Sequence, residues 1–192
     1  MNNLQNTQFR KNSKRYHSYY INRFISLRCS VDMLQLGLFP NAKEITESFA
    51  ALEAVNHLPY DWKDPDVHVI CVGDGLTPRT AATFAFMTKW TCISVDPLLK
   101  GKWEIDRLTA HPNKIEDMCC STNKPTIVVC VHSHASLQSC MQSIHSPYIS
   151  IVAIPCCQPL YLNQQPDMEY VDGDMWSPQN TVKIWRNVSS AV

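Results

Sequence analysis

The chain has 192 residues, and its 17 basic and 17 acidic residues cancel to a formal net charge of zero. A hydrophobic content of 45% without net charge excludes a disordered chain. No run approaches the roughly 20 apolar residues of a membrane span, so we expect no membrane contact. With 5 glycines and no internal period, a fibrous protein is also excluded. The length suits one domain with a short appendage.

The charges are unevenly distributed along the chain. Residues 1–31 carry six basic residues and no acidic one, which leaves 11 basic and 17 acidic residues in the remainder. We expect residues 1–15 to be a flexible basic tail. Its Arg10, Lys11, Lys14 and Arg15 are candidate RNA contacts, because basic side chains neutralise phosphates and the neighbouring aromatic rings stack on bases. There are two alternatives to RNA binding for this segment: a targeting sequence, or a tail without a binding role followed by a helix that docks on the domain.

Helical patterns come first in the chain, and alternating strands and helices follow. Apolar spacing predicts helices over 16–36 and 41–57, where Asn41 and Glu44 have the spacing of a capping box. We expect residues 16–58 to form a helical segment that packs on a domain over residues 59–192. In that domain we predict strands at 67–72, 91–95, 107–111, 126–131 and 148–154, helices at 77–89 and 135–144, and a closing hairpin of strands 169–176 and 181–187.

This order of elements predicts an α/β fold. Repeated strand–helix units favour a mostly parallel sheet with helices on both faces. The hairpin is expected to add an antiparallel edge, and the N-terminal helices to cover one face or edge of the sheet.

The turn after the first predicted strand carries the clearest sign of a ligand site. Gly73 and Gly75 turn the chain, and Thr77 has the position of an N-cap for the next helix. The second predicted strand ends at Asp96, an acid placed to accept hydrogen bonds from a ribose. In such sheets ligands bind at the carboxyl ends of the strands. These residues favour an adenosine-containing cofactor, and an ordinary strand–helix turn is the alternative.

The pattern resembles the first motif of class I S-adenosylmethionine-dependent methyltransferases, which have a Rossmann-like fold. Gly73 and Gly75 match the motif, whereas Cys71 stands in place of its acid and Thr77 in place of its last glycine. The resemblance implies S-adenosylmethionine as cofactor, with Asp74 as a neighbouring carboxylate and Asp96 on the ribose. It also implies an adenine-contacting loop at Glu116 and Asp117. An NAD(P)-dependent enzyme is disfavoured, because the third glycine of its fingerprint is missing.

Two later turns are similar to those of one subgroup of this superfamily, the tRNA 2′-O-methylase-like branch. His132 and His134 follow the fourth predicted strand, and Pro155, Cys156 and Cys157 follow the fifth. The resemblance covers about residues 67–187. Histidine titrates near neutral pH, so His132 and His134 are candidate general bases, with helix capping as the alternative. The Pro-Cys-Cys turn is a candidate substrate pocket, with buried packing of the thiols as the alternative.

The nine cysteines indicate a reducing compartment. Their number is odd, most lie in apolar stretches, and the N-terminus has no secretory pattern. We therefore expect a cytoplasmic or other reducing intracellular location and free thiols. No pair of cysteines has the spacing of a zinc site, so no metal is expected.

Two functions follow from these observations. The first is an S-adenosylmethionine-dependent methyltransferase that acts on RNA. The second is a catalytically inactive relative of that fold that serves as a binding or scaffold protein, favoured by Cys71 and by the missing third glycine. The small size suggests that substrate recognition depends on a partner protein or on a large RNA.

Overall fold

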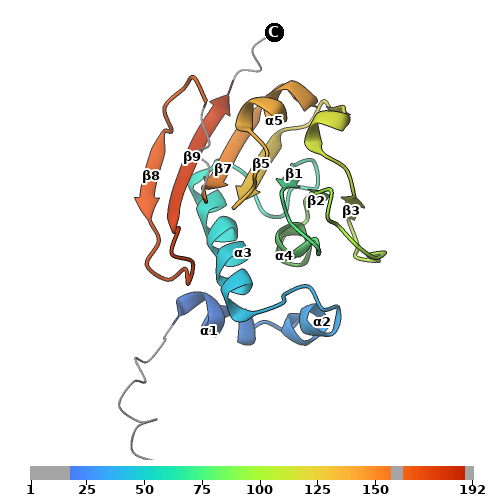
Figure 1. Ribbon diagram of the computed structural model, residues 1–192, viewed down its shortest axis with the longest axis vertical. Coiled ribbons are helices and arrows are strands. Elements are labelled where there is room, and N and C mark those ends of the chain that lie inside the picture. Colours follow the sequence, from blue (N-terminus) through green and yellow to red (C-terminus); the bar gives the residue numbers. More distant parts are fainter. Residues whose placement is uncertain (1–17, 157–161, 189–192) are drawn as a thin grey trace, which may run out of the picture.

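A computed structural model describes residues 18–156 and 162–188, and Figure 1 shows the arrangement of their helices and strands. In these residues the main sheet has seven strands in the order β3-β2-β1-β5-β7-β9-β8. The predicted strands are confirmed to within a residue or two at β1 His68–Val72, β2 Thr91–Val95, β3 Leu108–His111, β5 Thr126–Val131 and β7 Ile149–Ile154. Two short segments that the sequence did not indicate, β4 Cys120–Ser121 and β6 Ile144–His145, pair in parallel as a separate sheet.

The central strands are buried on both faces. Every residue of β5 and of β7 is buried, as expected for parallel strands covered by helices on each side. Successive side chains of β5 enter different cores: Ile127 packs with the cluster that includes α3 and α4, and Val128 with the cluster that includes α5. The prediction of a mostly parallel sheet with helices on both faces is therefore confirmed.

The single helix predicted over 16–36 is wrong, because the chain forms two shorter helices there. These are α1 Tyr19–Ile25 and α2 Ser30–Gln35. Two serine hydroxyls donate to main-chain carbonyls in the intervening turn, Ser26 to Arg23 and Ser30 to Leu27. Serine competes in this way with the hydrogen bonds of a continuing helix, and the apolar spacing contains no sign of that competition.

The next helix is where the sequence places it. The helix α3 spans Ala42–Ala54 and continues into the 3-10 turn η1, Val55–His57. The Asn41 side chain accepts a hydrogen bond from the Glu44 N–H at 3.2 Å, which confirms Asn41 as N-cap. Phe49 belongs to the same core cluster as the sheet residues. The N-terminal helices therefore share the core of the sheet.

The helix after β1 begins differently from the prediction. The helix α4 spans Arg79–Met87, with Pro78 at the N-cap position. Thr77 does not cap it, because its hydroxyl donates to the Leu38 carbonyl at 2.6 Å. The helix of the opposite face, α5 Leu137–Ser143, is capped by the Ser136 side chain.

The C-terminal hairpin lies partly inside the sheet. Its strands are β8 Met168–Val171 and β9 Thr181–Val188. In the described residues β9 is antiparallel to both of its neighbours, β7 and β8, so the hairpin forms the predicted antiparallel edge, with β8 outermost and β9 next to β7. The reason is burial, because β9 has buried residues such as Ile184 and Trp185, whereas β8 alternates half-buried and exposed residues that suit an edge.

The loop between β8 and β9 anchors the N-terminal helix α1. The hydroxyl of Tyr20 donates to the buried Asp172 carboxylate, and the Tyr19 N–H donates to Asp174. Trp176 lies in this loop rather than in a strand, with 37% of its surface exposed. The loop thus connects the first and last parts of the described chain.

None of the helices in residues 18–156 and 162–188 combines the length and the hydropathy needed to cross a bilayer. The cysteines of the seven-stranded sheet and of α5, namely Cys71, Cys92, Cys130 and Cys140, are buried free thiols. Burial raises the pKa of Cys92 to about 12, so this thiol is neutral and unreactive at physiological pH.

Candidate functional site

A cavity of about 670 Å³ opens at the carboxyl ends of the central strands. Its walls come from the turn after β1, the end of β2, the 3-10 turn η2 (Ile115–Asp117) and the turn after β5. This edge is the one that binds ligands in open α/β sheets. Of the predicted site residues, those that line the cavity are Gly73, Gly75, Asp96, Glu116, Asp117, His132 and His134.

Gly73 is required by the backbone and by its neighbour. Its φ of +87° is a conformation that L side chains rarely adopt. A Cβ atom at this position would lie 2.5 Å from Oγ and 2.8 Å from Cα of Ser133, in the turn after β5. The turns after β1 and β5 therefore meet closely only because residue 73 has no side chain.

Asp96 connects the end of β2 to the glycine turn. Its Oδ2 accepts a hydrogen bond from the Gly75 N–H at 2.8 Å, and its Oδ1 accepts one from the Leu98 N–H at 2.7 Å. Each carboxylate oxygen has a second lone pair, so these contacts leave acceptor capacity for a ligand hydroxyl. Asp96 therefore fixes the cavity wall and can accept hydrogen bonds from within the cavity.

Asp74 has a different position from the other predicted residues. It does not line the cavity, and its carboxylate accepts hydrogen bonds from the Thr80 N–H, the Ala81 N–H and the Ser94 hydroxyl. Burial raises the pKa of Asp74, although these donors oppose the shift. The residue thus serves as the N-terminal cap that Thr77 was expected to be.

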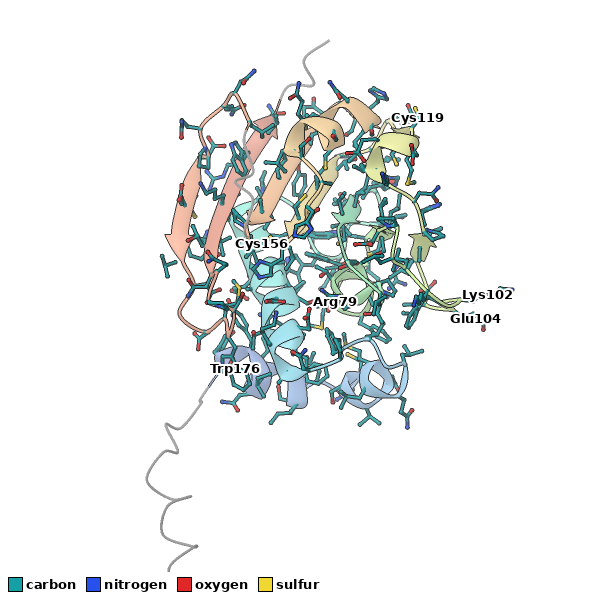
Figure 2. The ribbon with its side chains drawn as sticks, in the orientation of Figure 1. Arg79, Lys102, Glu104, Cys119, Cys156 and Trp176 are labelled. Carbon is teal, nitrogen blue, oxygen red and sulfur yellow. The ribbon has the colours of Figure 1, made fainter. Side chains whose placement is uncertain are left out.

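Arg79 lies at the start of α4 beside the glycine turn, and Figure 2 shows it between α3 and α4. It lines the cavity, and its Nη1 donates to the Asp74 carbonyl. Its Nε lies 2.6 Å from Oε2 of Glu44, as an ion pair. The sequence indicated Glu44 only as half of a capping box, and it contained no sign that α3 reaches this turn.

His132 contacts a second acid of α3. Its Nε2 lies 3.0 Å from Oε1 of Glu47, an ion-pair distance without the alignment of a hydrogen bond. Glu47 is 1% exposed, and Lys43 also contacts it at 2.8 Å. Burial alone would raise the pKa of Glu47, but the contacts with His132 and Lys43 outweigh it and lower the pKa to about 2. Glu47 is therefore ionised beside the cavity wall.

Glu47 is not among the residues that the sequence pattern indicated as functional. Lys43 and Glu47 are four residues apart on a helix, a spacing typical of a solvent-exposed ion pair. Only the packing of α3 on the sheet reveals that the carboxylate is buried and faces His132.

Some predicted site residues lie elsewhere. Thr77 does not line the cavity, and neither do Pro155 and Cys156, which are half-buried after the end of β7. Figure 2 shows where Cys156 lies. Outside the described residues are Cys157 and the basic residues Arg10, Lys11, Lys14 and Arg15. Among the described residues, no group of His, Cys, Asp and Glu side chains has an arrangement that could hold a metal ion.

No protein-family model and no curated protein sequence matches this chain. Among solved structures, a variant of MtNAS in complex with S-adenosylmethionine is similar with a TM-score of 0.55 and 10% identity, over 88% of this chain and 70% of that one. A second structure of that variant gives a TM-score of 0.48 and 11% identity, over 91% and 70%. A protein described as a sarcosine dimethylglycine methyltransferase from Galdieria sulphuraria gives 0.36 and 11%, over 56% and 46%. From the strand order and the first of these likenesses, we conclude that this chain has the Rossmann-like methyltransferase fold.

Proposed function

We propose that the chain is an S-adenosylmethionine-dependent methyltransferase that acts on RNA. The observation that carries this proposal is the cavity at the Gly73–Gly75 turn, with Asp96 in its wall, in a chain with this fold. The MtNAS structure contains S-adenosylmethionine, which supports the choice of cofactor.

The cavity residues suit the adenosine part of this cofactor. Asp96 would accept hydrogen bonds from the ribose hydroxyls. Leu98 and Ile115 offer apolar surface to the adenine ring, and the exposed acids Glu116 and Asp117 offer acceptors to its amino group.

A second group of cavity residues suits the methionine part. Arg79 is a cation that would bind the methionine carboxylate. Gly73 keeps the turns after β1 and β5 in close contact beside this part of the wall, because a Cβ there would overlap Ser133. The cofactor supplies an activated methyl group on a sulfonium, and the protein aligns the acceptor with it and excludes water.

The alternative proposal is an inactive methyltransferase-like domain that binds a protein or RNA partner. One observation favours it: neither Cys71 nor Asp74 places a carboxylate in the cavity, since Cys71 is a buried thiol and Asp74 caps α4. The methionine ammonium would then lack its usual acidic partner from this strand. Cofactor binding and methyl transfer distinguish the two proposals.

Two finer assignments belong to the same proposal. The Pro155-Cys156-Cys157 sequence, which follows β7 in the chain, supports membership of the tRNA 2′-O-methylase-like subgroup. The buried thiols support a cytoplasmic or other reducing compartment.

Titration of the native protein with S-adenosylmethionine and S-adenosylhomocysteine in a calorimeter should show binding of both. Asp96→Ala should weaken both affinities about 10-fold or more, because it removes a charged acceptor and releases the turn at Gly75. Asp96→Asn keeps one acceptor oxygen and should lose less.

Glu104→Ala is the matched control, because Glu104 is exposed and lies at the outer edge of the molecule in Figure 2, away from Arg79. Its affinities should equal those of the native protein. Absence of native binding at about millimolar cofactor would refute the enzyme, and equal affinities for Asp96→Ala would refute the assignment of Asp96.

Deletion of residues 1–15 should weaken RNA binding and flatten its salt dependence. Each lost phosphate contact should reduce the slope of log affinity against log salt by roughly 0.7 for a single strand. A full-length control with Arg10, Lys11, Lys14 and Arg15 replaced by glutamine should behave like the deletion, measured by fluorescence anisotropy on a polyribonucleotide. If both variants keep the native slope, the basic tail does not contact RNA.

A further inference from the structure

The buried acid Glu47 is the group in this site that most needs a physical explanation. A carboxylate that is 1% exposed has lost its water, and acidic residues are almost never fully buried without a partner. Lys43 is one partner, but its side chain is 42% exposed and could neutralise an acid at the surface equally well. The partner that explains the inward position of Glu47 is His132, at 3.0 Å.

His132 has an uncommon main-chain conformation. Its φ of +50° lies in the left-handed region, which non-glycine residues seldom adopt. The neighbouring strand β7 holds it there, since the His132 N–H donates to the carbonyl of Ile154, the last residue of β7, at 2.8 Å. Strained residues of this kind cluster at active sites, where the surrounding structure maintains them.

The imidazole of His132 also has an unsatisfied nitrogen. Its Nδ1 is buried and has no hydrogen-bond partner among the described residues, while Nε2 contacts Glu47. The residue lines the cavity in which we place the cofactor. A buried polar atom without a partner, at a cavity wall, is where a ligand group would complete the hydrogen bonding.

We propose that Glu47 is the positioning residue for His132 as a general base toward the hydroxyl acceptor that the tRNA 2′-O-methylase-like subgroup implies. This inference rests on the proposed function. The negative charge of Glu47, 3.0 Å from Nε2, favours the tautomer that carries its proton on Nε2 and leaves Nδ1 as the basic atom. A hydroxyl acceptor needs such a base because it is a poor nucleophile while it keeps its proton.

Methyl transfer forms one bond to the methyl carbon and breaks another. Nδ1 of His132 takes the proton of the acceptor hydroxyl. At the same time the oxygen of that hydroxyl forms a bond to the methyl carbon. The bond from that carbon to sulfur breaks, and the sulfur keeps the electron pair as a neutral thioether. Glu47 stabilises the resulting imidazolium, which then releases its proton to solvent.

Glu47→Gln should lower kcat about 100-fold for methyl transfer to a polyribonucleotide, with KM and S-adenosylhomocysteine affinity changed less than about 3-fold. In the same variant the NMR chemical shifts of the His132 imidazole nitrogens should move, because the charge that selects the tautomer is gone. Glu53→Gln is the control on the same helix, since Glu53 pairs with Arg23 away from the cavity, and it should leave all four readouts unchanged.

His132→Asn is the second variant, because asparagine tolerates the left-handed conformation. It should reproduce the loss of kcat, and adding Glu47→Gln to it should lower kcat no further. Native kcat in either single variant, or unchanged imidazole shifts in Glu47→Gln, would overturn the proposal. Failure of cofactor binding in the native protein would instead refute the methyltransferase function, and the imidazole shifts would still test the contact between Glu47 and His132.

Discussion

Gly73→Ala is expected to destabilise the protein by about 3 kcal/mol or more. The left-handed φ of +87° costs a non-glycine residue roughly 1–2 kcal/mol. The new Cβ would also lie 2.8 Å from the main-chain Cα of Ser133, and relieving such an overlap costs about 1–3 kcal/mol. Since the stability of a domain is only about 5–15 kcal/mol, urea denaturation should show a large shift of the midpoint.

Gly101→Ala is a closely matched control for this substitution. Gly101 has nearly the same φ, +86°, but the nearest atom to its Cβ would be 3.9 Å away, on Trp103. It should therefore lose only about 1–2 kcal/mol, the conformational cost alone. Equal losses in the two variants would mean that Ser133 does not restrict residue 73 and that the turns after β1 and β5 are not in close contact.

Asp74→Ala is expected to cost about 3–5 kcal/mol, also measured by urea denaturation. It leaves two N–H groups at the start of α4 and the Ser94 hydroxyl without their acceptor, and each buried unsatisfied group costs about 1–3 kcal/mol. Asp74→Asn keeps a side-chain oxygen for the helix and should lose about 1–2 kcal/mol. Asp61→Ala, which removes one exposed contact to the Lys63 N–H, is the control and should cost less than either variant.

The same pair of Asp74 variants separates the two roles of this residue. If Asp74 only caps α4, Asp74→Asn should bind S-adenosylhomocysteine as the native protein does, since the carboxylate does not line the cavity. A loss of affinity without a loss of stability would show that its charge reaches the methionine ammonium after all.

In the C-terminal hairpin the residue pattern predicts the strands but not their order in the sheet. The alternation in β9 predicted a strand, but the placement of β9 between β7 and β8 depends on which strand needs cover on both sides. The break between α1 and α2 could not be predicted from apolar spacing. It depends on hydrogen bonds that the Ser26 and Ser30 hydroxyls donate to main-chain carbonyls.

The sequence by itself determined the parallel strands, the glycine turn and the position of Asp96, because these depend on local hydrophobic runs and on the chain conformations that glycine permits. Only the tertiary structure decided that Asp74 caps a helix and that α3 brings Glu44 and Glu47 to the turns after β1 and β5. Contacts between distant segments depend on the packing of whole helices against the sheet. The spacing of Lys43 and Glu47 is typical of an exposed ion pair, but the packing of α3 buries Glu47 and gives it His132 as a second partner.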